Sequence, residues 1–283
     1  MRKHKFVDKH PILSSFLIFF LLLIGQEIIG GLLTLIHTSI FGPEVHELVK
    51  ILHILIAAAI LFFLYKWWFR PDFEGALKGG DLRNPLIYFV PLLIHWIITA
   101  IAMIIEHSFS FKGISLQIIR LSLTAGLFEE LWFRHAFVST LLRNKNQKNQ
   151  LYKIILISSL FFGFVHITNI FVGADPLSTI NQVLTATCFG IYFAVVYMRC
   201  GNLLYPIILH TAHDIYAVST SATVTTEGII EGGLSLSSYI DLICCILMAF
   251  YAIKYLLPEK EKEKVVAIWN HKWNKDNIET TIE

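Results

Sequence analysis

The sequence predicts an all-α membrane protein, a polytopic helix bundle of about eight transmembrane helices with both termini in the cytoplasm. Composition, the lengths of the apolar stretches and the positions of Lys and Arg support this fold class. Hydrophobic residues make up 55% of the 283 residues and charged residues only 16%. Because a soluble domain carries about 25% charged residues, this chain has too few to cover a surface that faces water. A soluble enzyme, a disordered chain and a basic nucleic-acid-binding protein are therefore excluded.

The apolar stretches have the length that a membrane requires. A helix crosses the hydrocarbon core with about 20 apolar residues. Eight stretches qualify, at residues 12–36, 48–68, 85–105, 114–142, 152–171, 179–198, 202–220 and 235–257. The first follows Arg2, Lys3 and Lys5, as in a signal peptide, but no cleavage site of small residues follows it. We therefore expect it to be retained as a helix.

The positions of Lys and Arg predict the orientation. Of the 23 such residues, 19 lie in the N-terminal segment, in the loops after the second, fourth and sixth stretches, or at the C-terminal end. The loops on the opposite side contain only Lys112. Because cytoplasmic loops retain Lys and Arg, we expect both termini in the cytoplasm, and eight spans fit this alternation. Residues 1–258 should form one membrane-embedded domain, and residues 259–283 a charged cytoplasmic tail.

Ionisable residues are concentrated in three of the eight stretches. A charge in mid-membrane is costly, so it usually faces a cavity and usually has a function. The fourth, fifth and seventh stretches supply the candidate site residues Glu129, Glu130, Arg134, His166, His210 and Asp214. Glu129, His166 and His210 lie roughly 21, 20 and 17 Å from their cytoplasmic ends, at about 1.5 Å per residue. These similar depths on three helices predict one shared site.

Spacing along each helix suggests separate roles for these residues. Glu130 and Arg134 stand four apart and share a face, so they are expected to form an ion pair. Glu129 lies about 100° round the helix from Glu130 and stays free for chemistry. His210 and Asp214 are also four apart, and Pro206 should kink the helix just before them.

The other polar residues of the apolar stretches are assigned no catalytic role. A lone His in a membrane helix is more often a hydrogen-bond partner between helices than a catalyst, which we expect for His53 and His95. His135 and His213 lie off the faces of the site residues beside them, so a structural role is expected. Asp241 has no partner at helical spacing and stays unexplained.

A carboxylate beside two imidazoles in a poorly hydrated cavity suits the activation of water. The carboxylate acts as the general base, and an imidazole with a second polar group donates to the oxyanion that forms at the attacked carbonyl. Peptide-bond hydrolysis without a covalent intermediate is the reaction class that this predicts. A divalent metal such as zinc is an alternative, with candidate ligands Glu129, His166, His210 and Asp214. The His-Glu-x-x-His helix of common zinc peptidases is absent, and the residues leave both mechanisms open, so no cofactor is assigned.

Three motifs follow one another on three stretches: Glu129-Glu130-x-x-x-Arg134, Phe162-x-x-x-His166 and His210-x-x-x-Asp214. Together, over about residues 120–217, they resemble the CPBP family, the CAAX-protease and bacteriocin-processing membrane peptidases also called Abi proteins. The resemblance implies an α-helical membrane endopeptidase whose site opens toward the cytoplasmic side. It also implies that Glu129 activates water with support from Glu130 and Arg134. His166 would position water or substrate, while His210 and Asp214 would stabilise the oxyanion.

The last motif indicates which branch of the CPBP family the chain resembles more. The prenyl-protein branch ends this motif in Asn, whereas this chain has Asp214, so the bacterial branch with its peptide-processing and immunity members looks closer. An ionised Asp214 would repel an oxyanion, so this residue would have to be protonated or only orient His210.

The leading hypothesis is an intramembrane endopeptidase that cleaves a membrane-associated peptide or protein. Its expected partners are that substrate and the lipid bilayer, and its expected location is the cell membrane. The alternative is a non-catalytic membrane regulator or bacteriocin self-immunity protein with the same fold, and the intact motif set favours the enzyme. A transporter with a proton relay is disfavoured, because the chain lacks the repeated halves and paired broken helices of many carriers.

Overall fold

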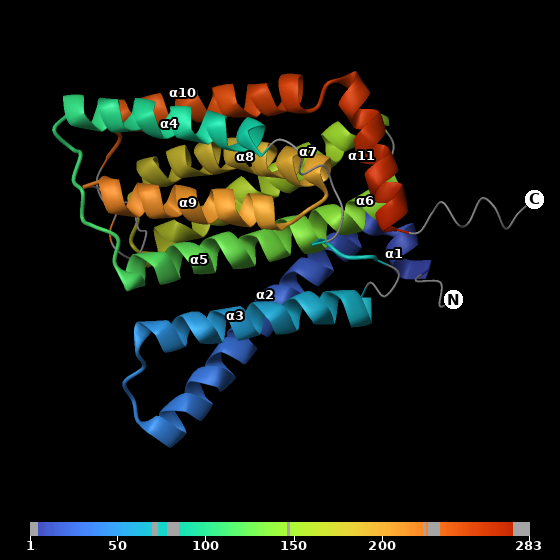
Figure 1. The fold of residues 1–283 in the computed structure, drawn as a ribbon, viewed down its shortest axis with the longest axis horizontal. Helices are drawn as coiled ribbons and strands as arrows, with labels where there is room; N and C mark the ends of the chain where they lie inside the picture. Colours follow the sequence, from blue (N-terminus) through green and yellow to red (C-terminus); the bar gives the residue numbers. More distant parts are fainter. Residues whose placement is uncertain are drawn as a thin grey trace, which may run out of the picture.

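A computed structural model describes residues 5–69, 73–77, 85–145, 148–222, 225 and 233–273 of the chain. Over these residues the regular structure is helical, and extended pairing is limited to an isolated β-bridge between Phe109 and Ser221. The predicted all-α fold is confirmed. In Figure 1 most of the long helices run along one direction with their loops at the two ends, and α1 and α11 lie at the same end.

The helices follow the predicted stretches in order. They are α1 (Lys5–Lys9), α2 (Pro11–Phe41), α3 (Glu47–Leu64), α4 (Leu86–Ile105), α5 (Leu116–Glu130), α6 (Ser139–Lys145), α7 (Lys148–Val165), α8 (Pro176–Cys200), α9 (Leu204–Thr220), α10 (Leu236–Tyr251) and α11 (Glu259–Lys272). Three π-helical segments, η1 (Tyr65–Phe69), η2 (Leu131–Val138) and η4 (Ala252–Leu256), continue α3, α5 and α10, and the 3₁₀ segment η3 (His166–Val172) continues α7.

Six helical segments in the described part of the chain are long and apolar enough to cross a membrane. They are Pro11–Phe41, Glu47–Trp67, Leu86–Ile105, Lys148–Val172, Pro176–Cys200 and Leu236–Leu256. The protein is thus a membrane protein. The other two predicted spans contain α5 and α9, of 15 and 17 residues, which carry the three site carboxylates and His210. The count of eight spans and the cytoplasmic termini stay predictions, and residues 1–4 and 274–283 lie outside the described ranges.

Local sequence fixes how α8 is joined to its neighbours. The Asp175 carboxylate accepts a hydrogen bond from the Ser178 amide at 2.8 Å, and Pro176 begins the helix. Both features favour a helix start, because they satisfy or remove amides that lack a helical partner. Gly201 ends α8 in the left-handed region at φ 63°. The Asn202 side chain then accepts from the Leu204 amide at 2.9 Å, so α9 starts within a tight turn.

Small residues let the site helices approach closely. A β-carbon on Gly126 of α5 would lie 2.8 Å from the Thr211 amide nitrogen of α9, which is closer than atoms can pack. A β-carbon on Gly163 of α7 would likewise lie 2.5 Å from the Val183 carbonyl oxygen of α8. Such close crossings are typical of membrane helices that pack through small residues. Gly126 thereby holds the Glu130 end of α5 against His210, the residue before Thr211.

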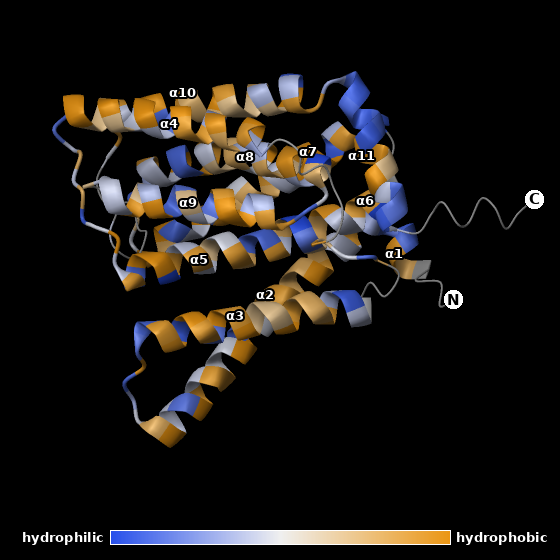
Figure 2. Ribbon diagram, in the orientation of Figure 1, coloured by the Kyte–Doolittle hydropathy of each residue, from blue (hydrophilic) through white to orange (hydrophobic). Residues whose placement is uncertain are grey.

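α11 packs across the end of the bundle. Figure 2 shows that it is largely hydrophilic, in contrast to the mostly apolar α4 and α10. Its apolar face is nevertheless buried: Trp269 is fully buried, and its indole donates to the Met198 carbonyl at 2.9 Å. Lys272 donates to the Gly75 carbonyl at 2.8 Å, and burial lowers the pKa of Lys272 to about 8 although Glu74 acts in the other direction. Residues 259–272, expected as the start of a charged tail, thus form a docked helix. The division into domains stays a prediction.

Candidate active site

Glu130 joins two basic side chains at the centre of the bundle. Its side chain is fully buried; one carboxylate oxygen lies 3.1 Å from Arg134 Nε and the other 2.9 Å from His210 Nδ1. The ion pair predicted from the four-residue spacing is present. The bond to His210 was not predicted, because it joins α5 to α9. We call Glu130, Arg134 and His210 the arginine cluster.

Aromatic rings and η2 enclose the arginine cluster. The Arg134 guanidinium lies 4.5 Å from the Phe162 ring centre and 5.6 Å from that of Phe193, and its Nη2 donates to the Gly190 carbonyl at 3.4 Å. His210 stacks on Phe193 with ring centres 5.2 Å apart. These rings exclude water, so charge–charge attraction within the cluster is stronger than at a surface. The π-helical η2 that carries Arg134 starts directly after Glu130, and π-helical turns occur often at functional sites.

Glu129 and Asp214 flank the other nitrogen of the His210 ring. A Glu129 oxygen lies 3.8 Å from Nε2 and an Asp214 oxygen 3.7 Å from it. Both distances exceed a hydrogen bond, so Glu130, and not Asp214, orients the imidazole. Glu129 Oε2 is buried and has no hydrogen-bond partner among the described residues. Because a buried acceptor is costly to leave unpaired, this oxygen is suited to hold a water.

His166 reaches the site from the point where α7 passes into η3. Its Nδ1 donates to the Phe162 carbonyl at 2.9 Å, which leaves Nε2 as an acceptor when the ring is neutral. The ring lines the same cavity as Glu129, His210 and Asp214. The structure therefore brings these four residues to one cavity, while Glu130 and Arg134 lie behind its wall.

The cavity has a volume of about 410 Å³ and extends toward one end of the bundle. Met103 near the end of α4, Ser221 directly after α9, and Ser237 at the start of α10 also line it. This is the end opposite α11 in Figure 1. On the orientation predicted from Lys and Arg, it is the non-cytoplasmic end. This differs from the cytoplasmic opening that the family resemblance implies.

The cavity is also lined by uncharged polar residues that were not predicted from the sequence. Asn181, Gln182 and Thr185 of α8 line it, and Gln182 accepts a hydrogen bond from Asn169 of η3 at 2.9 Å. Their spacing along α8 places the three on one face of the helix. This polar face is the sequence signal that could have identified them. Amide and hydroxyl groups on this wall can hydrogen-bond the backbone of a bound peptide.

Metal-ligand geometry does not single out the predicted ligands. Among the described residues, the His, Cys and carboxylate donors that converge as a group of three are His95, Asp241 and Cys245. None belongs to the set Glu129, His166, His210 and Asp214, and His210 Nδ1 is already bonded to Glu130. The side chains at the cavity and a water molecule therefore suffice for the proposed chemistry.

Comparison with known proteins gives a match in the part of the chain that contains the candidate site. No curated protein and no solved structure matches the chain. A family model described as type II CAAX prenyl endopeptidase Rce1-like matches residues 111–216, a range that contains all six predicted site residues. Over residues 111–216 the chain is therefore similar to the Rce1-like family of CAAX prenyl endopeptidases, in agreement with the CPBP resemblance of its motifs.

Proposed function

We propose that the protein is an intramembrane endopeptidase that hydrolyses a peptide bond with a water molecule activated by Glu129. The observation that carries this proposal is the buried Glu129 oxygen, which has no hydrogen-bond partner in the part of the chain that the structure describes and lies on a cavity wall 3.8 Å from His210 Nε2. A general base of this kind needs a bound water within reach and a nearby group that stabilises charge. The match to a protease family supports this activity.

In the proposed mechanism Glu129 takes a proton from water as the oxygen attacks the scissile carbonyl carbon. This gives a tetrahedral intermediate that carries the new hydroxyl group, and the former carbonyl oxygen becomes the oxyanion. Glu129 then passes the proton to the leaving nitrogen, and the carbon–nitrogen bond breaks. His166 Nε2, as an acceptor, orients the attacking water. No covalent intermediate with the protein is formed.

The arginine cluster prepares His210 to stabilise the oxyanion. Glu130 accepts from Nδ1–H, which fixes the ring and keeps Nε2 on the cavity side. When the ring is protonated, Nε2–H donates to the oxyanion, and Glu130 stabilises the imidazolium. Arg134 compensates the remaining charge of Glu130. Asp214 lies beyond hydrogen-bond distance of His210, so its role here is to donate to the oxyanion in its protonated form.

The proposed substrate is a membrane-associated peptide or protein, and the bilayer is the second partner. With eight spans and cytoplasmic termini, the cavity faces the non-cytoplasmic half of the membrane, and a peptide would enter from there. Reporter fusions after Pro43 and Pro176 should then be non-cytoplasmic, and a fusion at the C-terminus cytoplasmic. A non-cytoplasmic C-terminus would contradict this orientation.

The experiment that tests the function compares membrane peptides in cells that express the wild type or Glu129→Gln. Glu27→Gln is the matched control, because Glu27 is an exposed carboxylate on α2 outside the cavity. We expect cleavage products to disappear with Glu129→Gln and to persist with Glu27→Gln, at equal protein abundance. If Glu129→Gln supports every product and phenotype, the protein acts as a non-catalytic regulator or immunity protein instead.

A further inference from the structure

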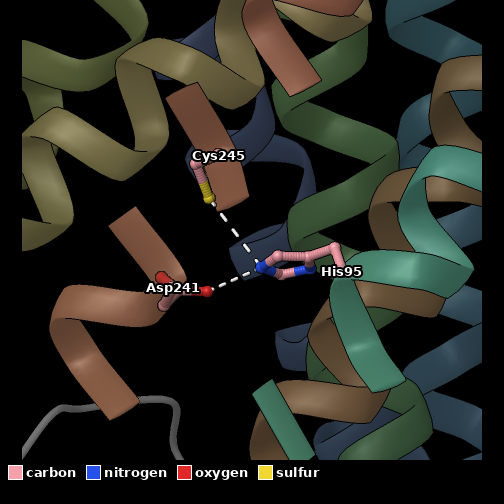
Figure 3. Close-up of side chains that lie close together, drawn as sticks. All are labelled: His95, Asp241 and Cys245. Atoms are coloured by element: carbon pink, nitrogen blue, oxygen red, sulfur yellow. Dashed lines mark hydrogen bonds and ion pairs between the residues drawn. The ribbon is translucent and has the colours of Figure 1, made fainter. Parts of the chain in front are cut away.

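Three metal-ligating side chains meet between α4 and α10, outside the proposed catalytic set. His95 Nε2 lies 2.7 Å from an Asp241 oxygen and 3.9 Å from Cys245 Sγ. Figure 3 shows that Asp241 and Cys245 both approach this one ring nitrogen from α10. The two residues stand four apart on α10 and therefore share a face. We call His95, Asp241 and Cys245 the cysteine cluster.

We propose that the cysteine cluster binds a divalent cation of the zinc class. The three donor atoms all lie within 4.8 Å of one another. In a tetrahedral zinc site the bonds to nitrogen, oxygen and sulfur place nitrogen about 3.3 Å from oxygen and about 3.6 Å from sulfur. To reach these distances, the Asp241 oxygen would have to move away from His95 Nε2 by roughly half an ångström. Cys245 Sγ would have to move toward His95 Nε2 by less than that. Both are side-chain movements.

The chemistry of the ligands selects the class of ion. One imidazole, one carboxylate and one thiol are nitrogen, oxygen and sulfur donors, a mixed set that suits zinc or cobalt rather than magnesium or calcium. Binding of the ion releases the Cys245 thiol proton to water, and the resulting thiolate and the Asp241 carboxylate together balance the charge of a divalent ion. His95 and Cys245 are each only 1% exposed, so their bonds to the ion would be shielded from competing water.

The cavity supplies an entry path and a fourth ligand. Asp241 lines the same cavity as Glu129, and its side chain is 32% exposed. An ion can therefore reach the donors from the cavity, and a water there can complete the coordination, as in zinc sites with three protein ligands. The bound ion would join α4 to α10 beside the catalytic cavity. The proposal does not rest on the proposed peptidase activity.

Cobalt(II) is a suitable probe, because a cobalt–thiolate bond produces a charge-transfer absorption that reports on the sulfur ligand. The full-length protein is purified in detergent, treated with a chelator, freed of it and titrated with cobalt chloride. We expect a saturable band at one cobalt per chain that zinc abolishes by displacement. His95→Gln should weaken binding by more than about 100-fold, since loss of an outer-shell partner alone costs 10–100-fold.

Matched variants make the assignment specific. Cys245→Ser should abolish the charge-transfer band, whereas Cys244→Ser should retain it, because the neighbouring Cys244 is outside the cluster. Glu129→Gln should also retain the band, which separates this site from the catalytic residues. A thermal melt of each variant verifies that it is folded. The proposal is overturned if the folded wild type gives no saturable band, if Cys245→Ser leaves the band intact, or if Cys244→Ser or Glu129→Gln removes it.

Discussion

The arginine cluster and the cysteine cluster border one cavity but balance their charges in different ways. In the arginine cluster a permanent cation lies beside Glu130, and both residues come from consecutive turns of one helical stretch. In the cysteine cluster the described neighbours of the Asp241 carboxylate are a histidine from α4 and a thiol from α10, neither of which is a permanent cation. In the arginine cluster, Arg134 supplies the counter-charge of Glu130. The cysteine cluster is suited to acquire one from a bound metal ion.

This comparison predicts that loss of Arg134 has the largest effect on stability. Arg134→Ala leaves the fully buried Glu130 without its permanent counter-charge, and breaking a buried pair costs about 3–5 kcal/mol. Lys264→Ala is the control, because the half-exposed Lys264 pairs with Glu261 within α11 and such exposed pairs are worth about 0–1 kcal/mol. Thermal unfolding in detergent and abundance in the membrane measure both. Equal losses from the two variants would contradict the description of the arginine cluster.

The same contrast explains what the sequence could and could not reveal. The Glu130–Arg134 pair follows from the four-residue spacing, and the apolar stretches anticipated the long helices. The Glu130–His210 and His95–Asp241 bonds join residues far apart in the chain, and only helix packing brings them together. His95 was expected to bond another helix, and it does, but Asp241 could not be identified as its partner. α11 was not anticipated as a docked helix, because its buried Trp269 follows a run of charged residues.

The next largest effect should come from separating α5 and α9. Gly126→Ala places a methyl group against the Thr211 backbone, and overpacking of this kind costs about 1–3 kcal/mol. We expect lower thermal stability together with loss of processing, since Glu130 moves away from His210. Gly30→Ala is the matched control, because the added methyl would meet nothing within 4 Å. Full activity of Gly126→Ala would show that this close approach is dispensable.

The cysteine cluster should tolerate loss of its carboxylate better than the arginine cluster tolerates loss of Arg134. Asp241→Ala in metal-free protein removes the carboxylate partner of His95 Nε2 and leaves the weaker contact with Cys245 Sγ at 3.9 Å, so the cost is at most that of an unsatisfied buried polar group, about 1–3 kcal/mol. Asp241→Asn retains a partner for the ring and should lose less. Thermal melts of both variants alongside Arg134→Ala test this order. A loss in Asp241→Ala greater than in Arg134→Ala would reverse the comparison.

The smallest effect concerns Lys272, which is buried outside the membrane-spanning helices. Its pKa in the folded protein is about 8, against 10.5 as the ordinary value, so the unfolded chain binds more protons between these two pH values. Stability should therefore rise with pH across this window, by about 1 kcal/mol from pH 8 to pH 9. Melts of wild type and Lys272→Met at both pH values measure it. An equal rise in Lys272→Met would assign the effect to other groups.

The most direct test of the central claim is a double-mutant cycle on the processing rate, measured per folded protein. We propose that Glu129 activates water at a site where Glu130 holds His210. Residues that act as one catalytic unit are strongly non-additive, because the first deletion already removes most of the rate. We predict that Glu129→Gln and His210→Ala each reduce processing to background, and that the double variant is no slower than either. Wild-type processing by folded Glu129→Gln, or independent losses that multiply in the double variant, would contradict it.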